Sequence, residues 1–493
     1  MSEEPESLKR EGGIESYGFV QIFRSFQLAV RPTNLVLAAA ALVATLAWGG
    51  VLDAVWKASD AGVPANAIGS YVRGEAAGVG TDPADDVGLF EVWRTHTRWC
   101  LESAMASLLR RSIWGEGTAG MTGMPALTAG RSPMTSPTDL GGQPVGFLPS
   151  LGLLCSGTTW MVRSAPGFSV LLLAGTLGIW ALFGGALCRV SAVQFARDER
   201  LGLGDALTYA RQHYWGGYFL SPVLPALMVA VIGLFLALGG VFLRIPLLGD
   251  VVGGLLFGLA LIGGLAAGLI LLGSFGGGSL FWPTVAAEGS ESLDAVSRSF
   301  NYVAVNPWRT IFYSLVGTAY AGLCYLFVRL LAYLTLAATH AFVSFGTAPF
   351  GWWKIGEGTA ATSKLELIWA APAFDQLQPV LTAPGGLTSV SAWLIGIWVS
   401  LVLLMVWAFL ASFYFSASTV VYFLLRRDTD SIDLEDVYMD TYEEGEYEAA
   451  DKRPPEPTSP APQSGVGVQL TVEGKEAAGA AASQGDQEDG DEA

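Results

Sequence analysis

The chain has 493 residues, of which 52% are hydrophobic and only 14% are charged, whereas about a quarter of the residues of soluble domains are charged. This composition indicates a membrane protein. The formal net charge of −17 is concentrated in residues 428–493, where 19 acidic residues face three basic ones, so the rest of the chain is close to neutral and nucleic-acid binding is not expected.

Six stretches are long and apolar enough to cross a bilayer, which takes about 20 helical residues. They are residues 34–52, 168–188, 219–243, 251–275, 311–328 and 393–425. Acidic residues precede the first stretch, which is the wrong flank for a cleaved signal peptide, so we interpret it as a retained span, with a signal anchor as the alternative. The last stretch would be about 48 Å of helix and must tilt or protrude from the membrane.

A short amphipathic helix is predicted within the N-terminal residues 1–33, directly before the first span. Around "RSFQLAVRP" (24–32), the apolar residues Ile22, Phe26 and Ala29 recur at i, i+4 and i+7, which places them on one helical face. Pro32 then marks the break before the spanning helix, because a residue before proline avoids the α region. We call this arrangement an elbow.

A second elbow is predicted before the fifth span, where "SRSFNYVAVNPWRT" (297–310) repeats the Arg-Ser-Phe motif and the proline that follows it. Here Val296, Phe300 and Val303 have the same spacing. If these elbows lie in the headgroup layer, each leads into a membrane hairpin. The alternative is that Arg24 and Arg298 line a shared site, which would require acidic or polar partners in the neighbouring spans.

A third, weaker elbow is expected before the third span, on Leu203, Leu207 and Ala210. Its register is open. An offset of 93 residues aligns Tyr209 and Trp215 with Tyr302 and Trp308, and an offset of 89 instead aligns Asp205 and Ala206 with Asp294 and Ala295. The predicted fold is therefore an all-α polytopic transmembrane helix bundle of about six spans, in three units of one amphipathic elbow plus one hairpin.

The extracytoplasmic segment 53–167 divides into two parts. Residues 87–112 have apolar residues at helical intervals, which predicts one amphipathic helix against the membrane or the bundle. Residues 115–157 are rich in Gly, Thr, Ser, Pro and Met, which predicts a flexible loop. Cys100 and Cys155 both fall on this oxidising side, so a disulfide and two free thiols are both open.

The fourth span is rich in glycine. Glycines at i and i+4, such as Gly254 and Gly258 or Gly264 and Gly268, let helices approach closely, within the monomer or across a dimer. The following "GSFGGGS" (273–279) is interpreted as a flexible or broken helix end. Unwound glycines at membrane depth can line a transport site, so this segment supports a transporter hypothesis.

Ionisable residues are nearly absent from the spans. Arg329 is expected at the outer end of the fifth span, where it would snorkel to the headgroups, with a buried functional arginine as the alternative. His96, His213 and His340 fall in separate segments and are not expected to share a metal. We therefore assign no catalytic, cofactor-binding or metal-binding residue, and no cofactor.

Two further segments complete the chain. Residues 346–392 are expected to form an extracytoplasmic loop with an interfacial aromatic cluster, "FGWWKIG". After the last span, in 393–427, residues 428–493 are predicted to be a disordered acidic tail, because they cannot bury enough apolar area to fold. Its tyrosines Tyr438, Tyr442 and Tyr447 are candidates for a docking motif or for phosphorylation.

The distribution of Lys and Arg orients the spans, because cytoplasmic loops carry an excess of both. With the N-terminus inside, the inner set is Lys9, Arg10, Arg24, Arg31, Arg189, Arg197, Arg200, Arg211, Arg298, Arg309, Arg426 and Arg427. The outer set is Arg244, Arg329, Lys354 and Lys364. Both termini are therefore predicted to be cytoplasmic.

Four segments carry a resemblance to known proteins: "FVQIFRSF" (19–26), "GALCRVSAVQFARDERLGLGDAL" (185–207), "AEGSESLDAVSRSFNYV" (287–303) and "YFLLRRD" (422–428). In these segments the chain resembles a group of uncharacterised multi-pass inner-membrane proteins of planctomycete-type bacteria. The resemblance implies a multi-pass protein of the cell inner membrane and brings no activity with it.

Three functions are open at this point. The first is a non-enzymatic scaffold or assembly helper that contacts the lipid bilayer and docks a protein partner through its acidic tail or its extracytoplasmic segment. The second is a transporter or channel for a lipid or apolar solute, and the third is a membrane enzyme. A homo-oligomer is compatible with each of them.

Overall fold

The computed structural model describes residues 18–58, 63–64, 67–73, 86–109, 147–245, 252–347, 365, 368–374 and 387–439. These residues are almost entirely helical, and they include six helices long and apolar enough to cross a membrane. The six are Pro32–Lys57, Pro166–Arg197, Tyr214–Phe242, Gly254–Glu288, Pro307–Gly346 and Ser389–Asp430. Each corresponds to one predicted span, so the predicted all-α polytopic bundle is confirmed and the protein is an integral membrane protein.

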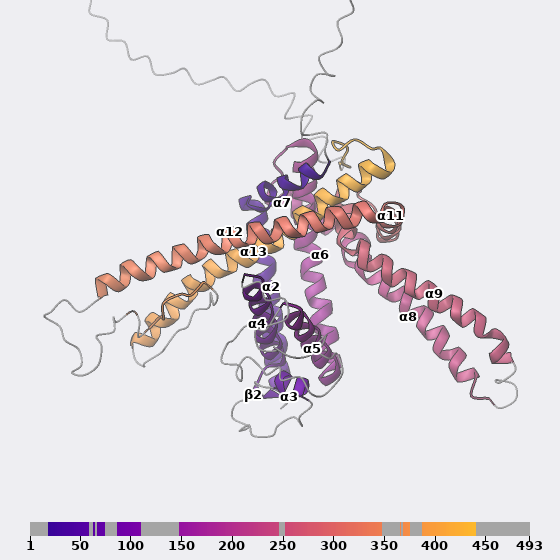
Figure 1. Cartoon of the computed structure of the whole chain (residues 1–493), viewed down its shortest axis with the longest axis horizontal. Coiled ribbons are helices and arrows are strands. Elements are labelled where there is room, and N and C mark those ends of the chain that lie inside the picture. The colour runs from indigo at the N-terminus through magenta and orange to yellow at the C-terminus, as the bar shows by residue number, and fades with distance from the viewer. Residues whose placement is uncertain are drawn as a thin grey trace, which may run out of the picture. The chain divides into compact units, whose positions relative to one another are not determined.

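Consecutive spans pair as three hairpins. Helix α2 (Pro32–Lys57) packs along α6 (Pro166–Arg197), α8 (Leu220–Phe242) along α9 (Gly254–Gly277), and α12 (Pro307–Thr347) along α13 (Leu387–Asp430) (Figure 1). Proline occupies the first turn of α2, α6 and α12, where its missing N–H has no intrahelical partner to lose.

The third hairpin is longer than the sequence predicts. Helix α12 has 41 residues and α13 has 44, which correspond to about 60 and 66 Å of helix. The expected fifth span, 311–328, was too short, because the apolar sequence continues helically to Thr347. Both helices exceed the roughly 30 Å hydrocarbon core.

Short helices precede the first helix of each hairpin. They are η3 (Gly18–Phe23) with α1 (Arg24–Ala29), then α7 (Leu203–Gln212), and α11 (Ser292–Val305). Helix α7 continues through the wide turn η5 (Tyr214–Phe219) into α8. The three predicted elbows are confirmed, and we call the end of the spans at which they lie the elbow end. The last residues of α7 and α11 are 93 positions apart and their first residues are 89 positions apart. Each predicted offset therefore matches at one end of the helices, and the register stays open.

Each elbow packs on the hairpin before its own, and the first elbow packs on the third hairpin. Helix α7 packs on α6 of the first hairpin, α11 on α8 and α9 of the second, and α1 on α13 of the third. The apolar faces of the elbows therefore contact protein rather than lipid alone. The buried positions of α11 are Ser292, Ala295, Val296, Ser299 and Tyr302. The three units close into a cycle because the first elbow lies against the last span.

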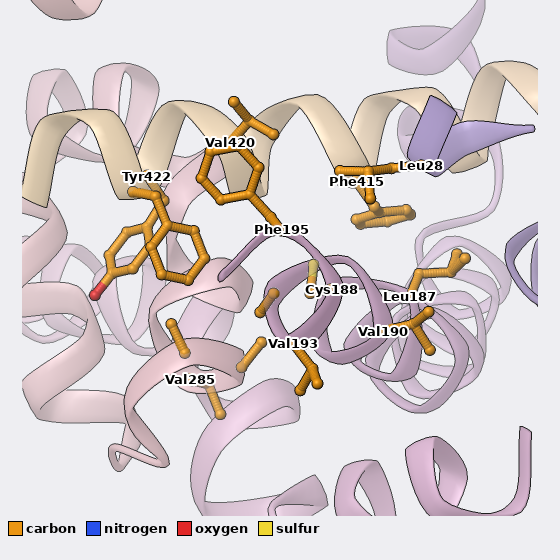
Figure 2. Close-up of a cluster of buried hydrophobic side chains, with 14 of the residues drawn as sticks. Leu28, Leu187, Cys188, Val190, Val193, Phe195, Val285, Phe415, Val420 and Tyr422 are labelled. Carbon is orange, nitrogen blue, oxygen red and sulfur yellow. The ribbon is translucent and has the colours of Figure 1, made fainter. Parts of the chain in front are cut away.

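The core at the elbow end is built mainly from the segments in which each hairpin returns to that end, namely α6, the continuation of α9, and α13, which we call the return helices. Residues of the elbows, α2 and α12 contribute as well. After α9 the chain continues through η7 (Gly278–Leu280) into α10 (Phe281–Glu288), which packs on both α6 and α13. Figure 2 shows Val190 and Val193 of α6, Val285 of α10 and Phe415 of α13 in this core. Small side chains such as Ala186 and Ala192, both 0% exposed, allow the close approach that holds helices together in lipid.

All three return helices end in a left-handed residue. Asp198 follows α6 with φ of 57°, Gly289 follows α10 with φ of 64°, and Ser431 follows α13 with φ of 55°. These are the positive-φ residues among those the structure describes. A residue in this conformation ends a helix and turns the chain away from its axis, so the same reversal is built three times from three different residue types.

The opposite end of the first hairpin, which we call the cap end, carries a small helical subdomain. Strands β1 (Val63–Pro64) and β2 (Asp86–Val87) pair antiparallel, and they flank α3 (Ala67–Arg73). Helices α4 (Leu89–Leu109) and α5 (Phe147–Ser164) pack on each other, and α4 packs on α2. The Asp53 carboxylate of α2 accepts hydrogen bonds from the backbone N–H groups of Phe90 and Glu91, at 2.8 and 3.0 Å, and so caps the orphan donors of α4.

The expectations for the two outer segments are partly corrected. The amphipathic helix predicted at 87–112 is α4, but the range 115–157 is not all loop, because α5 begins at Phe147. Residues 110–146, with the methionines, and the "FGWWKIG" cluster lie outside the described residues. In the loop 346–392, Leu365 and Trp369 are buried with Leu336 and Val399 between α12 and α13.

Candidate functional site

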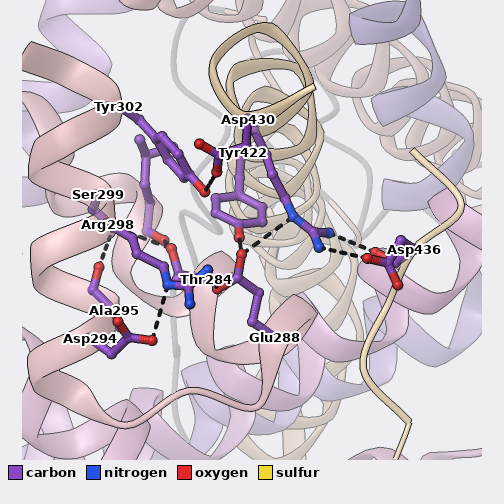
Figure 3. Close-up of polar contacts among 12 residues, drawn as sticks. Thr284, Glu288, Asp294, Ala295, Arg298, Ser299, Tyr302, Tyr422, Asp430 and Asp436 are labelled. Atoms are coloured by element: carbon purple, nitrogen blue, oxygen red, sulfur yellow. Dashed lines mark hydrogen bonds and ion pairs between the residues drawn. The ribbon is translucent and has the colours of Figure 1, made fainter. Parts of the chain in front are cut away.

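A buried carboxylate, Glu288, is the centre of a polar cluster at the elbow end (Figure 3). Glu288 is the last residue of α10, and its side chain is 9% exposed. The left-handed Gly289 turns the chain into α11, so α11 brings Arg298 back to Glu288. Helix α13 supplies Tyr422 and Arg426 from the other side.

Two guanidinium groups neutralise Glu288. Its Oε2 lies 2.8 Å from Nη1 of Arg298, and its Oε1 lies 3.3 Å from Nε of Arg426. Both contacts are at ion-pair distance without hydrogen-bond geometry. The Tyr422 hydroxyl donates to Oε1. Arg426 is 8% exposed, whereas Arg298 is 44% exposed and also donates to Oδ2 of Asp294 at 3.0 Å.

A second layer of polar contacts surrounds this centre. The Tyr302 hydroxyl donates to Oδ2 of Asp430 at 2.7 Å. Burial, the hydrogen bond to Asp430 and the nearby Glu288 raise the pKa of Tyr302 above its usual value. For Arg298, burial lowers the pKa, but the charges of Glu288 and Asp294 outweigh it, so its pKa is raised. Both groups therefore keep their protons at neutral pH.

The segment after α13 is fastened to this cluster. Arg426 donates from Nη1 to the carbonyl oxygen of Asp436 at 2.6 Å and from Nη2 to its Oδ2 at 3.1 Å. The backbone N–H of Tyr438 donates to the carbonyl oxygen of Ala287 at 2.8 Å. Val437 is 3% exposed and belongs to the main hydrophobic core.

Arg189 of α6, which lies in the core, also holds the segment after α13 in place. It is 0% exposed, and its Nη1 donates to the carbonyl oxygens of Ala286 and Tyr438, at 2.9 and 2.8 Å. Its guanidinium lies 3.9 Å from the centre of the Tyr209 ring. One buried arginine thus joins α6, α10, the α7 elbow and the segment after the last span.

These contacts correct the predicted start of the tail. The sequence predicts disorder from residue 428, but α13 extends to Asp430 and residues 431–438 pack on the core. Compact unit 1 ends at Tyr438. Of the predicted docking tyrosines, Tyr438 is therefore in the folded part, while Tyr442 and Tyr447 lie outside the described residues.

Arg24 and Arg298 do not share a site in the described contacts. The guanidinium of Arg24 lies 5.3 Å from the Phe195 ring centre, whereas Arg298 pairs with Glu288 and Asp294. Arg298 has its acidic partner Glu288 at the end of the fourth membrane-length helix, Gly254–Glu288, which extends past the predicted span 251–275. The signal for this site was the acid-rich "AEGSESLD" turn between two apolar helices.

Arg329 is buried, contrary to the snorkelling expectation. It is 4% exposed, because α12 continues 18 residues beyond it and residues 368–374 cover it. Its Nε and Nη2 donate to the carbonyl oxygen of Phe374 at 3.2 and 3.0 Å, and its Nη1 donates to the Tyr325 hydroxyl at 3.0 Å. The arginine therefore holds the outer loop against α12.

The histidines lie in three separate elements. His96 of α4 is buried, with Nε2 3.0 Å from the Leu153 carbonyl oxygen. His213 stacks on Tyr209, and His340 of α12 lies 3.2 Å from the Trp369 carbonyl oxygen. Among the described residues, no group of three or more His, Cys, Asp or Glu side chains is placed to hold a metal ion.

Cys100 and Cys155 are free thiols in the structure, so the disulfide left open by the sequence is not formed. Cys100 is buried and Cys155 is exposed. Burial raises the pKa of the Cys100 thiol to about 12, which keeps it protonated and unreactive at neutral pH.

Of the two roles predicted for the glycines of the fourth span, packing within the monomer is not found, and a contact across a dimer stays a prediction. A Cβ on Gly254, Gly258, Gly264 or Gly268 would meet no atom within 4 Å, so these glycines do not mediate packing within the monomer. The segment 273–279 is helical rather than broken. Added Cβ atoms on Gly273 and Gly276 would lie 3.1 Å from the Phe300 ring and 2.9 Å from Val303. The absence of side chains at these two positions therefore lets α11 pack closely against α9.

The arrangement around Glu288 is suited to holding chain segments together rather than to acid–base chemistry. A general acid or base needs a proton that it can exchange with substrate near neutral pH, whereas Glu288 faces two arginines and a tyrosine hydroxyl. We find no match to the chain among protein families, curated proteins or solved structures. The fold and the six apolar helices define the class, an integral multi-pass membrane protein.

Proposed function

We propose that the protein is a non-enzymatic membrane scaffold or assembly helper, which presents its acidic C-terminal segment to a protein partner. The observation that carries this proposal is the fastening of residues 431–438 by Arg189 and Arg426. The chain beyond Tyr438 therefore starts from a fixed point on the membrane-embedded core.

The topology that we propose places the elbow end in the cytoplasm and the protein in the inner membrane of a planctomycete-type bacterium. The excess of arginines at the elbow end supports this orientation, because positively charged loops stay on the cytoplasmic side. In this orientation the acidic segment meets cytoplasmic proteins, and a partner with a basic surface is the complementary one.

The acidic residues that immediately follow the fixed point are the first candidates for the docking segment. They are Asp440, Glu443, Glu444, Glu446, Glu448 and Asp451. A rigid start for a binding segment reduces the volume that it must search, which raises the effective concentration of its charges near a membrane-bound partner.

The proposal is tested with the full chain reconstituted in nanodiscs. A Lys/Arg-rich peptide is the probe, and a variant with all six of these acidic residues replaced by their amides is compared with the wild type. We expect the wild type to bind the peptide with a strong salt dependence and the variant to lose at least about tenfold in affinity, because surface charge attraction is screened by salt.

The matched control replaces six acidic residues farther along, between 473 and 492, by their amides. This control keeps the same net charge as the test variant and should bind the peptide nearly as well as the wild type. Equal losses in both variants would show a diffuse charge effect rather than a docking segment. Crosslinking in native membranes then has to recover the same partners from the wild type and the control, and unchanged partners in the test variant would contradict the proposal.

The alternative, a transporter or channel for a lipid or apolar solute, loses its main support. It depended on unwound glycines in 273–279, and these residues are helical and packed against α11. The scaffold is therefore the function we propose.

A further inference from the structure

Apart from the buried Arg189, which donates to backbone carbonyl oxygens, and Arg211 on α7, the described arginines at the elbow end fall into two groups. Four of them are paired with carboxylates of the protein: Arg298 with Glu288 and Asp294, Arg426 with Glu288 and Asp436, and Arg309 and Arg427 with Asp428. The other group surrounds the first elbow and the end of α6. Arg24, Arg31, Arg197 and Arg200 have no carboxylate of the described residues within ion-pair distance.

The second group is a local cluster. Arg24 of α1 lies over Phe195, in the last turn of α6. Arg31 is the residue directly before the first turn of α2. That turn contacts α6 through Asn34, whose Nδ2 lies 3.5 Å from Oγ of Ser191. The corner between α1 and α2 therefore lies beside the end of α6 and the turn that follows it. We call this surface the arginine corner.

Charge is under-compensated at the arginine corner. Its four arginines face two acidic residues of the same turn, Asp198 and Glu199, which leaves two positive charges in excess. Burial lowers the pKa of Arg31, the nearby Arg200 lowers it further, and Asp198 partly offsets this. The two arginines thus repel each other, and an anion between them would relieve the repulsion.

The position of the arginine corner indicates which anion is available. Pro32 and Arg197 are the first residue of α2 and the last residue of α6, so the corner lies at the elbow-end terminus of two membrane-length helices. Exposed apolar side chains lie directly beside it, with Phe23 45% and Val30 42% exposed. Lipid phosphates occupy this depth, and the planar guanidinium group of arginine matches a phosphate with two parallel hydrogen bonds.

We propose that the arginine corner binds the phosphate headgroup of an anionic phospholipid, with Arg24, Arg31 and Arg200 around the phosphate and the acyl chains beside Phe23 and Val30. The lipid supplies from outside the negative charge that Glu288, Asp294 and Asp428 supply at the other elbow-end arginines. This site is independent of the scaffold role, and it belongs to whichever leaflet the elbow end faces.

The test measures lipid binding to the purified full-length chain. Short-chain phosphatidylglycerol is the probe, phosphatidylcholine is the neutral control, and inorganic phosphate separates a lipid site from a phosphate site. We expect phosphatidylglycerol to raise the melting temperature and to remain bound in native mass spectrometry, with phosphatidylcholine and inorganic phosphate far weaker. Equal effects of phosphatidylglycerol and phosphatidylcholine would overturn the proposal, and so would an equal effect of inorganic phosphate.

The arginines are tested by the triple substitution Arg24→Gln, Arg31→Gln and Arg200→Gln. We expect its affinity for phosphatidylglycerol to fall by about tenfold or more, because each arginine near an anionic headgroup contributes to binding. The matched control is Arg244→Gln, an exposed arginine after α8 at the other end of the second hairpin, which should bind as the wild type does. Unchanged binding in the triple variant would refute the site.

Two further variants serve as controls. The first distinguishes loss of the lipid site from misfolding, and the second tests whether the protein's own acidic segment occupies the arginine corner. If the glutamine variant is poorly folded, the corresponding triple lysine variant keeps the charge, and it should retain most of the lipid binding. A chain with the acidic residues of 440–493 replaced by amides tests whether the protein's own acidic segment occupies the corner. Lipid binding that appears only in that variant would show that the acidic segment, not lipid, is the occupant.

Discussion

The α1 and α11 elbows have the same architecture and opposite electrostatics. Both are short helices that end two or three residues before a proline, and both bury one face against the preceding hairpin of the cycle. Around α11 the arginines are neutralised by carboxylates from α10, α11 and the last turn of α13. Around α1 the arginines have no carboxylate of the described residues within ion-pair distance. The same backbone element can therefore have its charges neutralised by the protein in one copy and, as we propose, by lipid in another.

The largest effect is expected from breaking the neutralised elbow at its centre. Glu288→Gln removes the carboxylate that pairs with both Arg298 and Arg426, and it leaves the buried Arg426 with only Asp436. Removing one partner of a buried pair costs about 3–5 kcal/mol, so we expect a loss of that order in the free energy of unfolding, measured by denaturation in detergent.

The control for this substitution is Glu291→Gln, three residues away and exposed. It removes the same charge from the same turn and should change stability by no more than about 0.5 kcal/mol. Equal effects of the two substitutions would mean that net charge, and not the buried pair, stabilises this elbow.

A steric substitution gives the next largest effect. Gly276→Val should separate α11 from α9, because a Cβ at Gly276 already lies 2.9 Å from Cγ1 of Val303. Overpacking of this kind costs about 1–3 kcal/mol. Gly268→Val, on the open side of the same helix, should be close to neutral in the same unfolding measurement. A destabilised Gly268→Val would reveal a contact on that face of α9.

An alkaline titration separates the two elbows further. The raised pKa of Tyr302 means that the folded state favours the protonated hydroxyl. The unfolded chain loses this proton from about pH 10, so the stabilisation is present below pH 10 and is lost as the pH rises through the folded-state pKa. Tyr302→Phe should therefore flatten the fall of melting temperature above pH 10. An unchanged slope would exclude Tyr302 as its source.

The smallest effect is expected from giving the first elbow a carboxylate of its own. Gln27 is exposed on α1, one turn after Arg24. Gln27→Glu should pair with Arg24 and change stability by only about 0.2–0.5 kcal/mol. It should also weaken phosphatidylglycerol binding at the arginine corner, whereas Gln27→Asn should not. Stronger lipid binding in the Gln27→Glu variant would contradict the charge argument.

The spans and elbows were predictable because their signals are local. Apolar runs of about 20 residues and the i, i+4, i+7 spacing before a proline depend on neighbouring residues only, and all six spans and all three elbows appear in the structure. The ends of the spanning helices were less predictable, because α12 continues past Arg329 on apolar residues whose sequence is equally compatible with a loop.

The polar cluster was not predictable in the same way. Glu288 and Arg426 are 138 positions apart in the chain, and nothing near either residue specifies the other. Arg189 likewise finds the carbonyl oxygen of Tyr438 across 249 positions. The composition of residues 428–438 is that of a solvated acidic segment, so only the tertiary contacts show that it folds on the core.

The closure of the cycle has a consequence for how the protein is made. The first elbow is synthesised well before its packing surface, α13, and the hydroxyl of Ser412 donates to the carbonyl oxygen of Ala29 across 383 positions. Those contacts cannot form until α13 has been synthesised. The amino-terminal hairpin must therefore wait in the bilayer with its elbow unmatched, and any factor that shields it during insertion acts on a surface that the finished molecule hides.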